Sequence, residues 1–161
     1  MIIAVVSDTH GKMLPTESAL QIIRGREVDM ILHCGDIGGA GLIELFADWP
    51  THFVFGNVDQ DRTTLHHTIE SAGQKSHGTF GDLVLAGKRI AFLHGDDKSR
   101  LRETINSGQW DLVCYGHTHR KEILRVSDAV VLNPGALFRA HPRTFALVEL
   151  PMLEIEFLEI P

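Results

Sequence analysis

Residues 112–119 read Leu112-Val113-Cys114-Tyr115-Gly116-His117-Thr118-His119, an apolar run that ends in two histidines. Side chains at positions i and i+2 of an extended segment point to the same side, so both imidazoles can face one ion. Neutral imidazole is the commonest metal ligand among side chains. Such a pair also occurs by chance in surface loops, so this stretch alone leaves a metal site and a plain loop both open.

The same pattern recurs elsewhere in the chain. Short apolar runs lead into Asp, His or Asn, mostly beside a glycine, at residues 5–10, 31–36, 53–57 and 90–95. Apolar runs without alternation are typical of strands that are buried on both faces. Ligands of open α/β sheets bind beyond the carboxyl ends of the strands. We therefore expect the ligand-type residues at these ends to converge, although Asp8 and His119 are far apart in the sequence.

Strands and helices alternate in the first half of the chain, and the second half contains mostly strands. Helices are expected over about 15–24, 42–46 and 97–105. Strands are expected over 2–7, 28–32, 51–55, 83–85, 89–93, 112–115, 122–126, 129–132, 144–150 and 153–160. Residues 60–79 are polar and match no clear element. This mixture predicts two sheets packed together with helices outside them, in a single domain over residues 1–161.

Composition narrows the class of protein. The chain has 161 residues, of which 43% are hydrophobic and 22% charged, with a net charge of −6. This acidic balance argues against extended nucleic-acid binding and against an acidic membrane surface as partner. The N-terminus has no basic segment of a signal peptide, and no apolar run is as long as a membrane helix requires. We expect a cytoplasmic protein whose two cysteines, Cys34 and Cys114, are buried reduced thiols.

Five motifs, taken in order, resemble the calcineurin-like metallophosphoesterase superfamily. They are Asp8-x-His10, Gly35-Asp36, Gly56-Asn57-x-Asp59, His94-Gly95 and Gly116-His117-Thr118-His119. The short chain and the tail Asn133-Pro134-Gly135-Ala136, with Arg139 and Pro142-Arg143 after it, resemble its small single-domain phosphodiesterase family of bacteria and archaea, which includes the small retromer subunit. The resemblance spans residues 1 to about 150. It implies an α+β (α/β) four-layer sandwich, in which two mixed β-sheets pack face to face and are flanked by helices.

The same resemblance implies a dinuclear centre of divalent metal ions. One ion would be bound by Asp8, His10, Asp36 and His119, and the other by Asp36, Asn57, His94 and His117. Asp36 would bridge both, as a carboxylate can when metals lie about 3.5–4 Å apart. Histidine, aspartate and asparagine ligands suit Mn²⁺, which we expect, and also Zn²⁺, Fe²⁺, Ni²⁺ or Co²⁺.

The implied activity is a metal-dependent phosphodiesterase, in which a metal-bridging hydroxide attacks the phosphorus of a small phosphoester substrate. Asp36, Asn57 and His94 are the expected catalytic residues. Asp59 is the candidate acceptor that would support the ligand histidines from behind.

Two departures from the wider superfamily affect this expectation. Val58 stands where many members have a histidine that donates a proton to the leaving group, a contribution of typically 10²–10⁴-fold. His66 and His67 are candidate substitutes, and Arg120 is a candidate substrate-binding residue. Gly39 and Ala40 occupy the positions of the Asp-Arg pair of the Ser/Thr phosphatase branch, which argues against a protein phosphatase.

Two alternative functions remain open. One is a phosphomonoesterase or nucleotide phosphatase on the same site, although the sequence shows no fixed cationic cluster for a dianionic monoester. The other is a non-catalytic interaction module like the retromer subunit, although every expected ligand position holds a competent ligand. The apolar strand expected over 153–160 could also pair at an edge and form a homo-oligomer.

Overall fold

The structure, a computed structural model, describes all 161 residues. Its first sheet has the strand order β11-β10-β1-β2-β3-β4, in which β1 to β4 run parallel and β10 and β11 are antiparallel to their neighbours. The bounds of these strands are β1 Ile2–Val6, β2 Met30–His33, β3 Thr51–Phe53, β4 Lys75–Ser76, β10 Arg143–Glu149 and β11 Glu154–Ile160. The expected C-terminal strand is therefore present and forms one edge of this sheet.

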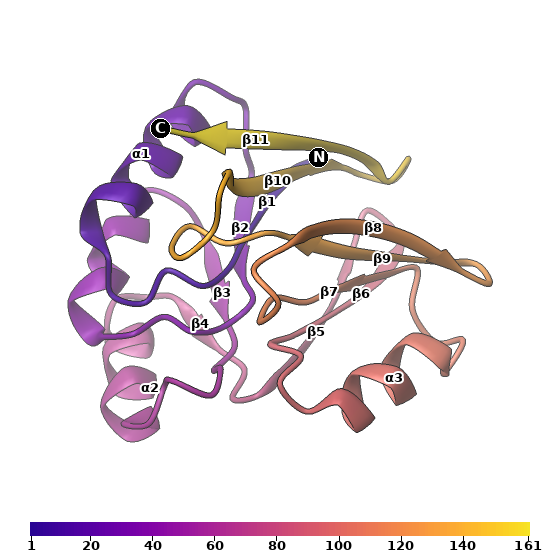
Figure 1. Cartoon of the computed structure of the whole chain (residues 1–161), viewed down its shortest axis with the longest axis horizontal. Helices are drawn as coiled ribbons and strands as arrows, with labels where there is room; N and C mark the ends of the chain where they lie inside the picture. The colour runs from indigo at the N-terminus through magenta and orange to yellow at the C-terminus, as the bar shows by residue number, and fades with distance from the viewer.

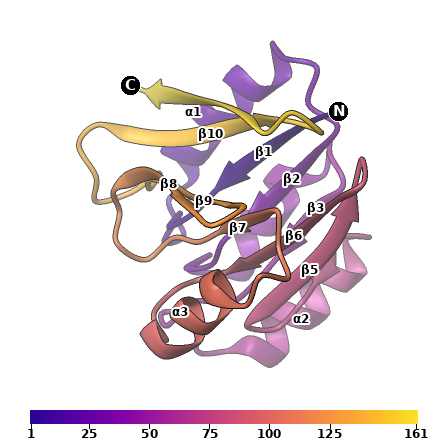
Figure 2. The same cartoon turned by 90° about the vertical axis from the view of Figure 1, so that its right-hand side faces the viewer.

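The second sheet has the order β5-β6-β7-β9-β8, with β6, β7 and β9 parallel. Its strands are β5 Phe80–Leu85, β6 Lys88–Leu93, β7 Leu112–Cys114, β8 Lys121–Val126 and β9 Ala129–Pro134. A hairpin turn at Ala86-Gly87 joins β5 to β6. Figure 2 shows β1, β2 and β3 side by side in one sheet and β5, β6 and β7 in the other.

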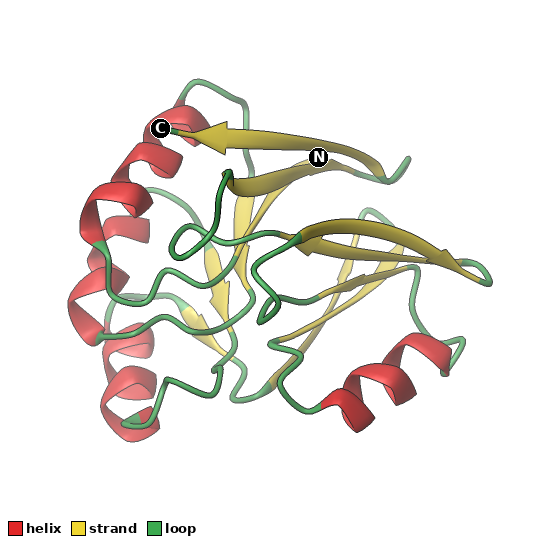
Figure 3. Ribbon diagram, in the orientation of Figure 1, coloured by secondary structure: helices red, strands yellow, loops and turns green.

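Helices cover the outer faces of both sheets (Figure 1 and Figure 3). Helices α1 (Met13–Arg24) and α2 (Arg62–Ser71) and the 3₁₀ helix η1 (Ala40–Phe46) pack on the first sheet, and α3 (Lys98–Asn106) packs on the second. The four-layer fold expected from the sequence is confirmed. None of the helices is both long and apolar enough to span a bilayer.

The core explains why the strands lack alternation. In β1, Ile3 and Val5 face the cluster between the two sheets, whereas Ala4 and Val6 face the cluster under the helices. Such strands are apolar at every position because both of their faces are buried. Cys34 and Cys114 are fully buried between the sheets, and burial raises the pKa of both thiols.

Residues 60–79, which matched no element in the sequence, form α2 and β4. Asp61 caps α2 by accepting the backbone N–H of Thr64 at 3.1 Å. Only Leu65 and Ile69 of this helix are buried. Its apolar stripe is too narrow to register as helical periodicity, and packing on the sheet stabilises the helix instead.

Candidate metal centre

The structure brings all seven expected metal ligands together. Asp8 and His10 follow β1, Asp36 follows β2, Asn57 follows β3, His94 follows β6, and His117 and His119 follow β7. Ligand atoms of Asp8, His10 and His119 lie within 4.8 Å of one another, and so do those of Asp8, Asp36 and His94. The carboxyl ends of parallel strands from both sheets thus meet at one place, as the recurring pattern predicts.

Unusual backbone conformations aim these side chains. Asp8, His10, Asp36, His117 and His119 all have positive φ, between 47° and 68°. Residues other than glycine rarely adopt this region, and each instance costs on the order of 1–3 kcal/mol. Hydrogen bonds between the loops hold them there. For example, the N–H of His10 donates to the carbonyl of Asp36 at 2.9 Å, and that of His117 donates to Asp8 Oδ2 at 3.1 Å.

The first group of ligand atoms surrounds Asp8. Its Oδ1 is buried and makes no hydrogen bond. The Nε2 atoms of His119 and His10 lie 3.1 and 3.7 Å from this oxygen. The same two ring nitrogens are 3.4 Å apart.

The second group surrounds Asp36. Its Oδ1 lies 3.2 Å from Nε2 of His94, and its Oδ2 lies 3.5 Å from Nε2 of His10. The side-chain oxygen of Asn57 lies 3.1 Å from Nε2 of His94 and 3.1 Å from Nδ1 of His117. Asp36 thus lies near one histidine of each expected ligand set, His10 and His94, whereas Asp8 is the carboxylate shared by the two triads of converging ligand atoms. The bridging role of Asp36 remains a prediction.

Backbone carbonyls fix the orientation of two imidazoles. Nδ1 of His94 lies 2.8 Å from the carbonyl oxygen of Cys34, and Nδ1 of His119 lies 3.2 Å from that of Arg139. Because a carbonyl only accepts, Nδ1 carries the proton in both rings. In the neutral rings, each Nε2 then directs its lone pair at the carboxylates, which is the tautomer that a metal ligand needs.

The electrostatics of the cluster favour bound positive charge. Burial by itself raises the pKa of Asp8, but the imidazoles of His10 and His119 outweigh it, so the pKa lies well below its usual value. The pKa of Asp36 is also lowered, because contacts with His94 and the N–H of Val58 outweigh burial. Conversely, the pKa of His94 is raised by Asp36 and Asp8 despite burial, and that of His119 is raised by Asp8. Both carboxylates therefore stay ionised at neutral pH.

This donor set fits divalent cations. The buried Oδ1 of Asp8, which accepts no hydrogen bond, faces Nε2 of His119, whose ring proton is held at Nδ1 by a backbone carbonyl. An amide oxygen and a second carboxylate complete a set of lone pairs that point at one another. Such groups repel unless a cation or extra protons lie between them.

Two glycines leave room for the ligands. A Cβ on Gly56 would collide with Asp36 Oδ1 and lie 2.8 Å from Cδ2 of His94, and a Cβ on Gly116 would collide with Ser7 Oγ. Neither glycine has a positive φ. Close approach of the backbone to the site, rather than a tight turn, therefore requires glycine at both positions.

Asp59 has partners other than those expected. Its buried carboxylate accepts the backbone N–H groups of Ile37, Gly38 and Gly56 at 3.1, 2.9 and 2.8 Å. It supports the loops that carry Asp36 and Asn57, whereas the ligand histidines with a backbone partner use the carbonyls of Cys34 and Arg139. Carbonyls carry no signal in a sequence, because every residue has one.

The remaining predicted residues lie outside this cluster. His66 and His67 are exposed on α2, and Arg120 lines a separate cavity with Tyr115 and Glu122. Val58 is 37% exposed beside Asn57. No contact joins His66, His67 or Arg120 to the ligand atoms, so their proposed roles remain predictions.

Asn133 supports the metal centre through its side chain, a role that the sequence did not indicate. It is fully buried in β9, and its Nδ2 donates to the carbonyl of Gly116 at 2.8 Å and to Thr118 Oγ1 at 3.0 Å. It thereby holds the loop that carries His117 and His119. Its place after an apolar strand-like run was the available signal.

Comparison with known proteins agrees with this geometry. A family model described as the calcineurin-like phosphoesterase superfamily domain matches residues 1–151. The chain belongs to this superfamily. Phosphodiesterase MJ0936 of Methanocaldococcus jannaschii is 30% identical over 138 residues, which cover 84% of this chain and 83% of that protein. The probable metallophosphoesterase YsnB of Bacillus subtilis is 30% identical over 148 residues, covering 85% and 75%.

Solved structures show the same fold. A structure described as a novel archaeal phosphodiesterase superposes with a TM-score of 0.92 at 26% identity, covering 99% of this chain and 100% of that one. Vps29 of Cryptosporidium parvum has a TM-score of 0.70 at 18% identity, covering 98% and 95%, which shows the shared fold alone. The expected family is confirmed, and with it a hydrolase that acts on phosphoester bonds with divalent metal ions.

Proposed function

We propose that this chain is a phosphodiesterase with two divalent ions, held by Asp8, His10, Asp36, Asn57, His94, His117 and His119. The observation that carries the proposal is the convergence of these seven side chains, in which carbonyl contacts at Nδ1 leave Nε2 of His94 and His119 free to bind an ion. Mn²⁺ is the proposed ion, residues 1–161 are the proposed catalytic unit, and a small phosphoester is the proposed substrate.

The charge of the ligand set supports a phosphate substrate. When bound, two divalent ions supply Lewis-acid chemistry, activating water and neutralising the phosphate oxygens. Asp8 and Asp36 oppose four positive charges with only two negative ones, and Asn57 adds a neutral amide oxygen. The pocket of this acidic protein would thus be locally positive and would attract a phosphate anion.

The chain's own residues position the reaction. The carbonyl oxygens of Cys34 and Arg139 hold the rings of His94 and His119, and Asp59 holds the backbone that follows Asp36 and that precedes Asn57. Val58 has no proton to give to a departing alkoxide. We therefore expect diesters with acidic leaving groups to be the faster substrates.

One observation favours hydrolysis of monoesters as the second candidate. Arg62 and Arg100 line a cavity together with His94. Neither guanidinium has a carboxylate partner: Arg62 donates to the carbonyl oxygens of Asp59 and Gly56, and Arg100 donates to Thr79 Oγ1. This cationic pair, which the sequence alone did not reveal, could compensate the second negative charge of a monoester. Acidic Asp96 and Asp97 line the same cavity and oppose that effect, which is why the diester is preferred.

The test compares bis(p-nitrophenyl) phosphate with p-nitrophenyl phosphate, using chelator-treated protein with and without Mn²⁺. We expect metal-restored turnover, faster for the diester, and its loss in Asp36→Asn together with loss of bound metal by elemental analysis. Asp48→Asn is the matched control, because Asp48 is an exposed acid paired with Arg24. Undiminished turnover in Asp36→Asn would overturn the two-metal site. Stoichiometric metal without turnover of either ester would instead support the interaction module.

A further inference from the structure

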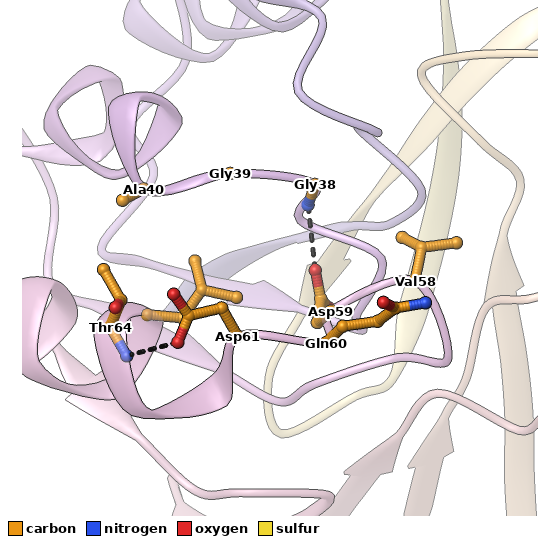
Figure 4. A pocket seen from close by; sticks show the side chains of 9 residues that line it. Gly38, Gly39, Ala40, Val58, Asp59, Gln60, Asp61 and Thr64 are labelled. Carbon is orange, nitrogen blue, oxygen red and sulfur yellow. Dashed lines mark hydrogen bonds between the residues drawn. The ribbon is translucent and has the colours of Figure 1, made fainter.

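A cavity of about 280 Å³ lies beside the candidate metal centre. Figure 4 shows Gly38, Gly39 and Ala40 along one side of it and Val58, Asp59 and Gln60 along another, with Thr64 at the end formed by α2. No sequence motif predicts this cavity, because its walls come from two segments, residues 38–40 and 58–65, that are separate in the chain.

The cavity shares its walls with the metal centre. Val58 directly follows Asn57, and its backbone N–H donates to Asp36 Oδ1 at 3.0 Å. Asp59 bonds the N–H of Gly38, two residues after Asp36, and that of Gly56. A substituent of a phosphate bound at Asp36 and Asn57 can therefore extend into this space.

The lining of the cavity selects against charged groups. No lysine, arginine or histidine lines it. The carboxylate of Asp59 is buried and saturated by three N–H groups. Asp61 caps α2, and its hydrogen bonds with Thr64 lower its pKa, so it remains an anion at the rim. A second phosphate or a carboxylate placed here would meet negative charge and find no cation to pair with.

Uncharged groups find suitable partners in the same space. Ala40, Val58 and Leu65 supply apolar surface. The amide of Gln60 makes no hydrogen bond within the protein, so it is available to a ligand, and the hydroxyl of Thr64 lies beside Asp61 at the rim. The cationic side chains, Arg62 and Arg100, line the other cavity, beside His94. The two cavities therefore offer unlike environments to the two substituents of a diester.

We propose that the cavity between residues 38–40 and 58–65 is the subsite for an uncharged, ring-sized organic substituent of the phosphodiester. The proposal rests on the phosphodiesterase function above and specifies its substrate class: diesters in which at least one esterified group carries no further phosphate or carboxylate.

Thr64→Phe fills the subsite and keeps the capping bond, which uses the backbone N–H of Thr64, although it removes the hydroxyl beside Asp61. Thr63→Phe is the matched control, since Thr63 is the exposed neighbour that does not line the cavity. The probe is diphenyl phosphate, a poorly hydrolysed diester, titrated calorimetrically into Mn²⁺-loaded protein. We expect Thr64→Phe to weaken its binding about tenfold or more, with Thr63→Phe within about twofold of the unsubstituted chain. Equal affinity in the two variants would overturn the subsite.

Charge selection provides a second, independent test. Gln60→Lys places a cation in the cavity, and Thr63→Lys places one just outside it. We expect Gln60→Lys alone to improve binding of 4-carboxyphenyl phenyl phosphate relative to diphenyl phosphate, by about fivefold. The same ratio in both lysine variants would count against the subsite.

The two proposals can fail separately. In one case, the protein binds diphenyl phosphate, Thr64→Phe abolishes this binding, and no diester is hydrolysed. That result would refute the phosphodiesterase and retain the subsite. Turnover of bis(p-nitrophenyl) phosphate with the same kcat/KM in Thr64→Phe and Thr63→Phe would refute the subsite and retain the phosphodiesterase. Bound metal and circular dichroism confirm that each variant is folded.

Discussion

Replacing Asp59 with asparagine should weaken both the fold and metal binding. The Asp59 carboxylate is 2% exposed and accepts three backbone N–H groups, from Ile37, Gly38 and Gly56, at 2.8–3.1 Å. Asparagine has nearly the same shape but only one acceptor oxygen. Its NH₂ group would face at least one backbone N–H, and that buried donor would lose its partner.

The magnitude follows from those contacts. An unsatisfied buried donor costs about 1–3 kcal/mol, and the surviving bonds lose the strengthening that an ionised acceptor gives. We expect the free energy of unfolding to fall by about 2–4 kcal/mol. A domain whose free energy of unfolding is about 5–15 kcal/mol remains folded after such a loss. Because the same bonds fix the loops that carry Asp36 and Asn57, Mn²⁺ affinity should fall about 10–100-fold.

Urea unfolding followed by tryptophan fluorescence measures the first quantity, and calorimetric titration of folded, metal-free protein with Mn²⁺ measures the second. Asp61→Asn is the control: Asp61 is an exposed helix cap with one amide partner, and asparagine caps about as well. A destabilisation below about 1 kcal/mol with unchanged Mn²⁺ affinity would show that the loops keep their shape without Asp59, and would refute this account of the site.

Two further predictions concern space and pH. Gly56→Ala should destabilise the fold by about 1–3 kcal/mol and impair Mn²⁺ binding, because the new methyl group collides with Asp36. Gly41→Ala is the control, because a Cβ there meets nothing within 4 Å, and it should change neither quantity. Urea titrations measure the stability, and calorimetry measures the Mn²⁺ affinity. The half-buried rings of His52 and His77 share a 2.8 Å hydrogen bond. Burial and His77 lower the pKa of His52 to about 4, and burial lowers that of His77. The unfolded chain therefore takes up protons first as pH falls, so stability should decrease between about pH 6.5 and pH 4, on the order of 1–2 kcal/mol after allowance for solvent screening. His52→Phe should flatten this decrease in urea titrations across that range, and an unaltered pH profile would contradict the assignment.

The convergence of the ligands was predictable because it depends on few assumptions. Apolar runs without alternation identify buried strands, and parallel strands in one sheet end at the same edge. The convergence of the ligand-type residues that follow these runs can then be predicted without knowing the paths of the loops. The residues that orient the ligands were not predictable in this way, since Cys34 and Arg139 act through carbonyl oxygens that any residue could supply.

Pairs that form between distant segments also escaped prediction. Nothing in the sequence around His52 and His77 suggests that they interact. In the structure, the ring of His52 in β3 stacks on that of His77, which follows β4, with ring centroids 5.0 Å apart. Likewise, Arg62 and Arg100 belong to helices on different sheets, α2 and α3, and only the tertiary fold brings them to one cavity with His94. Such neighbours depend on loop paths, which local propensity does not determine.

The backbone of the site shows why its residues cannot be explained by folding alone. Five of the seven proposed ligands occupy left-handed conformations in which glycine would be free of strain, yet aspartate and histidine stand there. At about 1–3 kcal/mol each, these positions oppose folding, and the interloop hydrogen bonds of Asp8, His10 and Asp59 offset only part of that cost. The strain has a consequence for function, because it directs side chains from both sheets at a common point. The chain thus has strained aspartate and histidine residues at the ligand positions, and glycine at 56 and 116, where a side chain would collide. This combination indicates a site shaped for bound cations rather than for stability.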